Sequence, residues 1–66
     1  MVTDKTIATH VFCGSGNIKV AKSNHQWTPV MNEHTRNGLF VRSEHTDCYF
    51  YFVTEKGETF FEFVEL

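Results

Sequence analysis

No apolar run in this 66-residue sequence is long enough to cross a membrane or to serve as a signal peptide. Cysteine is scarce as well. The pair Cys13 and Cys48 cannot supply a disulfide framework and is typical of a reducing compartment. These absences predict a cytoplasmic protein with no membrane partner. The chain starts with methionine and shows no linker, so we expect a short, complete reading frame that folds as a single domain over residues 1–66.

Excess charge of either sign is also missing, because the basic and acidic side chains leave a formal net charge of −2. Proteins that bind nucleic acids usually carry a clustered basic surface that neutralises phosphates. This sequence has no basic cluster, and we therefore do not expect a nucleic acid as its partner.

Catalytic motifs are absent from the sequence. It contains no nucleophile elbow, no glycine-rich phosphate loop and no paired metal motif. Gly14-Ser15-Gly16-Asn17 is not a dinucleotide fingerprint, because no helical pattern follows it. A chain this short also has little room for a deep substrate pocket. We expect a protein that is not an enzyme.

Aromatic residues are abundant instead, at 15% of the chain, and they concentrate in its last third. A domain of this size buries only about 60% of the surface that its unfolded chain exposes. Large rings compensate for a small core, since each one removes much apolar area from water.

Strand signals dominate the first part of the sequence. β-branched and aromatic residues form short runs between Gly and Asn clusters, and helical periodicity is nearly absent. The pattern predicts a hairpin that joins residues 6–13 to residues 17–23 through a turn at 14–16. Residues 24–38 contain the single proline and predict a connection or an edge strand. Asn37-Gly38 is either a hairpin turn, which we favour, or the end of a short helical turn near 32–37.

The remaining residues predict a strand at 39–44 and a final hairpin. This hairpin joins residues 47–54 to residues 58–65 around Lys56-Gly57. The fold class is therefore expected to be all-β. It would contain five or six short, hairpin-connected antiparallel strands in a curled sheet or small open barrel, with at most one short helical turn near 32–37.

The final hairpin would carry rings on both of its faces. The favoured register pairs Phe50 with Phe63 and Phe52 with Phe61, and these four side chains are expected in the core. The opposite face would be left for contact, covered by the middle segment or by a partner. We therefore expect a small protein-binding module that acts through an aromatic sheet face or an open strand edge. Its partner would be another protein or a second copy of itself, and it would act as an inhibitor or accessory protein of a mobile element or phage. The expected binding residues are Tyr49, Tyr51, Phe60, Glu62, Val64 and Trp27.

Two alternatives stay open at this point. Two His-x-x-Cys units would supply a ligand set for structural zinc, from His10, Cys13, His45 and Cys48. Residues three apart on a strand point to opposite faces, which argues against this site, and we expect no cofactor. The second alternative is weak binding of single-stranded nucleic acid by a face that combines rings with a cation. That face would carry His10, Phe12, Lys19 and Trp27.

Overall fold

The computed structural model describes residues 2–13 and 16–65, except for the side chains of residue 13 and of residues 62–65. These residues form three helices and three strands, so the prediction of an all-β fold was wrong. The elements follow the order α1 (Asp4–Cys13), β1 (Asn17–Ala21), α2 (Trp27–Arg36), β2 (Phe40–Glu44), β3 (Cys48–Val53) and α3 (Glu55–Glu65). None of the described helices is both long and apolar enough to cross a membrane.

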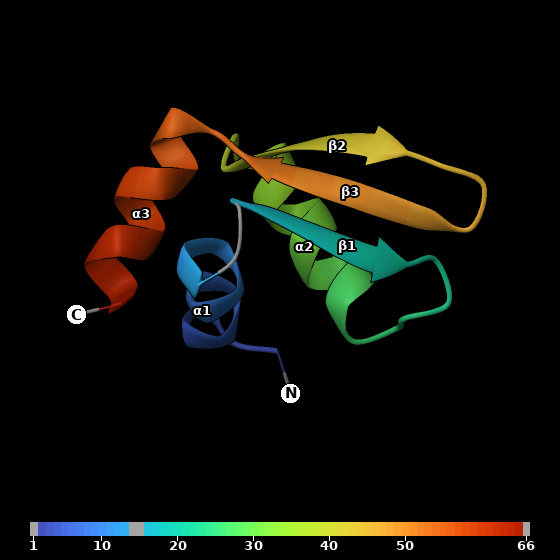
Figure 1. Ribbon diagram of the computed structural model, residues 1–66, viewed down its shortest axis with the longest axis horizontal. Coiled ribbons are helices and arrows are strands. Elements are labelled where there is room, and N and C mark those ends of the chain that lie inside the picture. Colours follow the sequence, from blue (N-terminus) through green and yellow to red (C-terminus); the bar gives the residue numbers. More distant parts are fainter. Residues whose placement is uncertain (1, 14–15, 66) are drawn as a thin grey trace.

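The three strands form one antiparallel sheet in the order β1-β3-β2 (Figure 1). β2 and β3 make a hairpin, in which Val41 lies opposite Phe52 and Ser43 opposite Phe50. β1 pairs with the other side of β3, so that Ile18 lies opposite Tyr51. The three strands were predicted close to their actual positions. The partner of β1 was wrong, because it pairs with β3 and not with residues 6–13.

Residues 4–13 form the helix α1 and not the predicted strand. The backbone N–H of Thr6 donates to Oγ1 of Thr3 at 3.2 Å, which caps the helix, and the acidic Asp4 suits the first turn. Ile7 and Val11 are buried and lie four residues apart, the spacing of one helix face. Both residues belong to the core, which they enter from a helix.

Residues 27–36 form α2, which overturns the predicted hairpin turn at Asn37-Gly38. Oδ1 of Asn24 accepts the backbone N–H groups of Gln26 and Trp27 at 3.1 and 3.0 Å. At the other end Gly38 has φ +83°, and its N–H donates to the carbonyl of Thr35. The N–H of the next residue donates to the carbonyl of His34. These bonds make a Schellman ending, which agrees with the less favoured alternative above, a helical segment that ends at Asn37-Gly38.

Residues 55–65 form α3, and Lys56-Gly57 is its first turn rather than a hairpin turn. Oγ1 of Thr54 accepts the N–H of Gly57 at 3.1 Å and caps the helix. A Cβ on Gly57 would run into the carbonyl oxygen of Leu39 and would lie 2.8 Å from Cγ2 of Val53. Glycine is therefore needed here because α3 passes close to the sheet, and not because the backbone requires a positive φ.

The helices pack on one face of the sheet, and this inner face forms the core. The core cluster combines strand residues such as Ile18, Val20 and Tyr51 with Met31 of α2 and Phe61 of α3. α2 lies behind the sheet in Figure 1, and α1 and α3 lie side by side at one end of it. The result is a two-layer arrangement of helices on a three-stranded sheet.

The predicted orientation of the last strand was inverted. Tyr51 is 0% exposed in the core, and Tyr49 packs partly buried beside it. Phe52, expected inside, is 44% exposed on the opposite face. Phe61 is buried as expected, whereas the side chain of Phe63 lies outside the described residues.

Candidate functional site: the open face of the sheet

The face of the sheet turned away from the helices carries a compact apolar surface. Phe52 is 44% exposed and Val41 is 59% exposed, and they face each other across β3 and β2. Phe50 is partly buried one step along β3, between Lys19 of β1 and Ser43 of β2. We call these five side chains, Lys19, Val41, Ser43, Phe50 and Phe52, the outer face.

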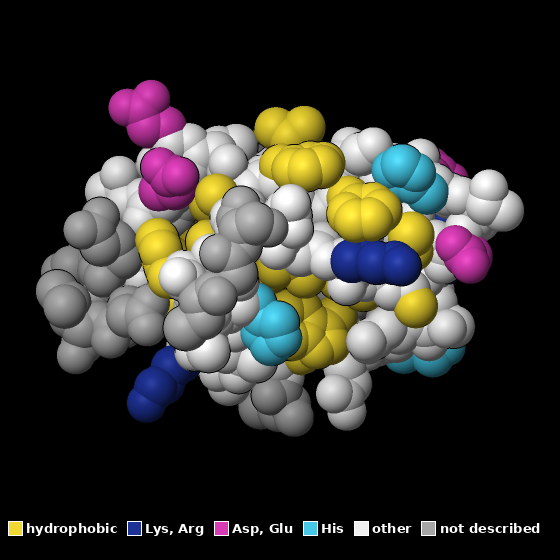
Figure 2. All heavy atoms as spheres, viewed as in Figure 1, with side chains coloured by type: hydrophobic (Ala, Val, Ile, Leu, Met, Phe, Trp, Pro, Cys, Tyr) yellow, Lys and Arg dark blue, Asp and Glu magenta, His cyan; other side chains and the backbone are white. Residues whose placement is uncertain are grey.

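Two rings on the central strand set the shape of the outer face. The rings of Phe50 and Phe52 lie 6.4 Å apart between centroids and are nearly parallel, at 19°. The ring of His45 meets Phe50 edge to face at 4.9 Å, and Nζ of Lys19 lies 6.0 Å from the centre of the Phe50 ring. Figure 2 shows hydrophobic side chains gathered over β2 and β3 on this side, with a cation and a histidine beside them.

Alternation along β3 places these rings outside. Successive residues of a strand point to opposite faces, so Tyr49 and Tyr51 must point inward if Phe50 and Phe52 point outward. The pairing with β1 fixes the choice. Ile18 and Val20 lie opposite Tyr51 and Tyr49 and are buried, as is Tyr51, and Tyr49 is partly buried against the same core.

The inner tyrosines are held by polar groups from neighbouring elements. The hydroxyl of Tyr51 donates to Oδ1 of Asn32 at 2.8 Å, and Nη1 of Arg42 donates to the same oxygen at 3.1 Å. Burial raises the pKa of the Tyr51 phenol above its ordinary value, and the charge of Arg42 works against that rise. The phenol therefore stays neutral as a hydrogen-bond donor inside the domain.

Most of the cations near the sheet belong to its inner side. The guanidinium of Arg42 and Nζ of Lys22 lie 4.7 and 5.3 Å from the centre of the Tyr49 ring. Lys22 also donates to Glu44 at 2.8 Å. This bond raises the pKa of the lysine and lowers that of the glutamate, so both groups stay charged and paired. Of the cations described on the three strands, Lys19 is the one that points to the outer face.

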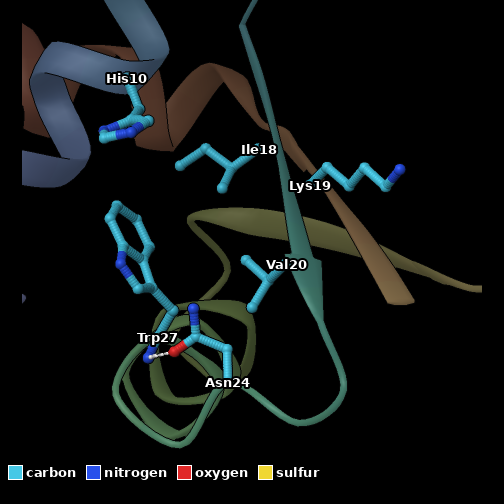
Figure 3. A pocket seen from close by; sticks show the side chains of 6 residues that line it. All are labelled: His10, Ile18, Lys19, Val20, Asn24 and Trp27. Carbon is cyan, nitrogen blue, oxygen red and sulfur yellow. Dashed lines mark hydrogen bonds between the residues drawn. The ribbon is translucent and has the colours of Figure 1, made fainter. Parts of the chain in front are cut away.

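A hollow lies beside the free edge of β1. It has a volume of about 250 Å³ and is lined by His10, Ile18, Lys19, Val20, Asn24 and Trp27. In Figure 3, Ile18 and Val20 point from β1 toward the Trp27 ring, and Lys19 points to the other side of the strand. The rings of His10 and Trp27 meet edge to face at 4.8 Å. We call this hollow the β1 groove.

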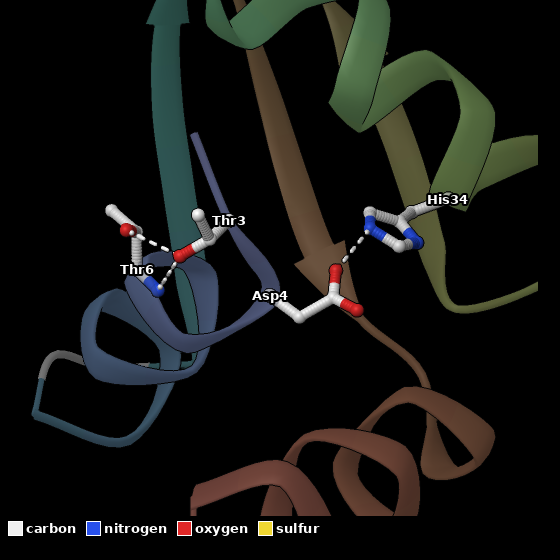
Figure 4. A network of polar contacts seen from close by, with 4 residues as sticks. All are labelled: Thr3, Asp4, Thr6 and His34. Atoms are coloured by element: carbon white, nitrogen blue, oxygen red, sulfur yellow. Dashed lines mark hydrogen bonds and ion pairs between the residues drawn. The ribbon is translucent and has the colours of Figure 1, made fainter. Parts of the chain in front are cut away.

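A polar contact fastens α1 to α2. Nε2 of His34 lies 3.2 Å from Oδ1 of Asp4 (Figure 4). Nδ1 of the same ring is buried with no partner among the described residues. The ring packs edge to face against Phe61 at 5.6 Å. This arrangement joins the two helices, so we assign it a structural role.

The expected binding residues do not form one surface. Tyr51 is in the core and Tyr49 packs against it. Phe60 is 37% exposed on α3, and Trp27 lies on α2 in the β1 groove. The side chains of residues 62 and 64, expected as Glu62 and Val64 of the same face, lie outside the described residues.

The possible zinc ligands are divided among α1, which carries His10 and Cys13, the β2–β3 connection, which carries His45, and β3, which carries Cys48. His10 lies on α1 beside Trp27, and His45 lies in the β2–β3 connection beside Phe50. Cys48 is buried, and the side chain of Cys13 lies outside the described residues. Where side chains are described, no group of three or more His, Cys, Asp or Glu residues could hold a metal ion. A zinc site that includes Cys13 stays a prediction.

No protein-family model, no curated protein and no solved structure matches this chain. The main residues of the outer face, Phe50 and Phe52, were missed because they had been assigned to the core. The helix caps at Thr3 and Thr54 could have revealed them, since helices at both ends of the chain cover the face that carries Ile18 and Val20.

Proposed function

We propose that this protein is a small binding module that docks its outer face against an apolar protein surface, and that this surface is the outer face of a second copy. The observation that carries the proposal is the exposure of Phe52 and Val41 beside Phe50, on the sheet face opposite the helices. An apolar patch rimmed by polar groups is typical of an interaction site. Aromatic rings are also enriched at the centres of protein interfaces.

The charge of the surface favours a protein over a nucleic acid. Among the described strand residues Lys19 is the cation on the outer face, while Lys22 and Arg42 lie over Tyr49 on the inner side. Phosphate neutralisation by one lysine would add little affinity. The net charge of −2 would also oppose a polyanion.

The outer face is suited to a second copy of itself. Its centre is apolar, and Lys19 lies on an edge strand, so two copies can pack their phenylalanine rings together while each lysine stays at the rim. Three strands of about five residues cover roughly 14 by 17 Å. This area is well below the roughly 800 Å² per partner of a standard stable interface, so we expect weak, reversible association.

Sedimentation equilibrium over a range from micromolar to millimolar protein tests the proposal. We expect the unmodified chain to pass from monomer to dimer, and Phe52→Glu to stay monomeric across the same range. Phe12→Glu is the matched control, because Phe12 is 40% exposed but lies on α1. Circular dichroism of both variants checks that they keep the fold.

Two results would overturn self-association through the outer face. One is a chain that stays monomeric at every concentration. The other is a dimer that Phe12→Glu weakens as much as Phe52→Glu does.

The nearly parallel rings of Phe50 and Phe52 also support a second candidate function, a stacking surface for single-stranded nucleic acid. It predicts oligonucleotide binding that weakens steeply with salt, and no binding at low salt would remove it.

A further inference from the structure

The backbone of β1 presents unused hydrogen-bonding groups along the side that faces away from β3. The carbonyl of Gly16 accepts from Val53 N–H, and Lys22 N–H donates to the carbonyl of Asp47. In an antiparallel ladder the bonded residues alternate, so Ile18 and Val20 also bond to β3. The N–H and C=O groups of Asn17 and Lys19, and the N–H of Ala21, therefore point to the free edge.

The β1 groove lies next to this edge, and its lining combines apolar side chains with polar ones. Ile18 and Val20 form one wall and Trp27 the other (Figure 3). His10 closes one end, where its Nδ1 is already engaged 2.9 Å from the carbonyl of Thr6. The groove thus offers apolar contact to side chains that enter beside the strand edge.

We infer that β1 captures an extended peptide as an additional antiparallel strand, with the peptide's inward side chains in the β1 groove. The edge supplies backbone hydrogen bonds and the groove supplies side-chain contacts, the two parts of peptide recognition by strand addition. This site is separate from the outer face, so either proposal can fail without the other.

The structure also indicates which peptide fits. A residue opposite Lys19 would exchange both backbone bonds with it, and its side chain would lie on the outer side of the sheet beside the lysine ammonium. An acidic residue is favoured there. The residues on either side of it would point into the groove between Trp27 and Val20, where leucine or valine is favoured. The expected pattern is apolar, acidic, apolar.

The free edge of β2 is a poorer candidate. The same alternation directs the backbone groups of Phe40, Arg42 and Glu44 to that edge, because His45 N–H donates to the carbonyl of Cys48 and Thr54 N–H donates to that of Leu39. Two of these three residues carry charged side chains, a common protection against strand addition.

The test uses the peptide acetyl-Thr-Leu-Glu-Leu-Thr-amide and two readouts. The chain contains a single tryptophan, so a change in fluorescence reports on the β1 groove. Amide chemical shifts report on the strand edge. We expect saturable changes in Trp27 emission and in the amides of Asn17, Lys19 and Ala21. A peptide methylated on the glutamate nitrogen keeps the side chains but cannot donate to the Lys19 carbonyl, and its methyl group would point at the edge of β1, so we expect it not to bind.

Exchanging the charges of Lys19 and the peptide glutamate separates binding in the expected strand register from nonspecific binding. Lys19→Glu should weaken binding of the glutamate peptide by about two- to fivefold, and a peptide with lysine at the same position should recover it. Lys5→Glu makes the same charge change at an exposed site of α1 and is the control, so it should bind the glutamate peptide as the unmodified chain does. The inference is overturned if the methylated peptide binds equally well. It is also overturned if Trp27 does not respond at millimolar peptide, or if the shifts centre on Phe50 and Phe52.

Discussion

Replacing Gly57 by alanine tests the contact that holds α3 against the sheet. Gly57 lies in the first turn of α3, where the carbonyl oxygen of Leu39 and Cγ2 of Val53 occupy the space that a Cβ would need. The Leu39 carbonyl cannot turn away, because it accepts the N–H of Thr54 at 3.0 Å. The added methyl group must therefore move α3 itself or the end of β2.

Two effects of opposite sign decide the size of the change. Alanine gains about 1 kcal/mol over glycine in a helix interior, and less near a helix end. Overpacking costs about 1–3 kcal/mol and more against a rigid group, so we expect a net loss of about 2 kcal/mol in the free energy of unfolding. In a domain of this size each kcal/mol shifts the melting temperature by about 4–8 °C, so it should fall by about 8–16 °C.

Thermal and urea unfolding followed by circular dichroism measure this change. A matched pair of variants separates crowding from backbone strain. Gly38 has φ +83°, and a Cβ there would approach the nearest atom of Lys56 only at 3.9 Å. Asparagine adopts positive φ more easily than other residues, so Gly38→Asn should be tolerated and Gly57→Asn should not. A melting temperature of Gly57→Ala at or above that of the unmodified chain would refute the close packing of α3.

Three further changes follow from the same contacts. Thr54→Ala should cost about 1 kcal/mol in thermal unfolding, because the Gly57 N–H loses its cap, and Thr54→Ser should restore most of it; equal stability of all three proteins would contradict the cap. Tyr51→Asp should unfold the chain, because the side chain is fully buried, and circular dichroism should then show the loss of its helices and strands. The neutral Tyr51 phenol should contribute fully to the free energy of unfolding below the pKa of an unfolded tyrosine, near 10. This contribution should fall as the pH rises toward the higher pKa of Tyr51 in the fold. Tyr51→Phe should flatten that fall in urea titrations at alkaline pH.

The strands could be predicted from the sequence, and the helices could not. Residues 17–20 alternate between polar and apolar, residues 40–44 begin with an aromatic and a β-branched residue, and residues 48–53 are almost entirely aromatic or β-branched, so each strand was placed close to its position. Ile7 and Val11 are four residues apart, and so are Gly57 and Phe61. That spacing suits one face of a strand as well as one face of a helix, so periodicity cannot separate the two in such short segments. Local caps settle the choice.

The pairing of the strands depended on information that no local pattern holds. A glycine turn between residues 6–13 and 17–23 favours a hairpin only if both segments are strands. Because α1 is helical, β1 has no neighbouring strand in the sequence and pairs instead with β3, some thirty residues away. The β1 groove arises from the same change, since it lies between α1, β1 and α2 and could not be seen in a chain of hairpins.

The arrangement of rings on β3 bears on function. Both faces of this strand are aromatic, and hydrophobicity alone would bury Phe50 and Phe52 and expose Tyr49 and Tyr51, whose hydroxyls prefer water. The chain does the reverse, and it needs Asn32 to satisfy the buried hydroxyl of Tyr51. An outer face of tyrosines would remain apolar enough for strand packing and would be better solvated. Phenylalanine there is an advantage only when the rings leave water, which is the state that docking of the outer face would produce. Phe52→Tyr should therefore leave the free energy of unfolding within about 0.5 kcal/mol, as surface substitutions usually do, and yet weaken the proposed dimer in sedimentation equilibrium.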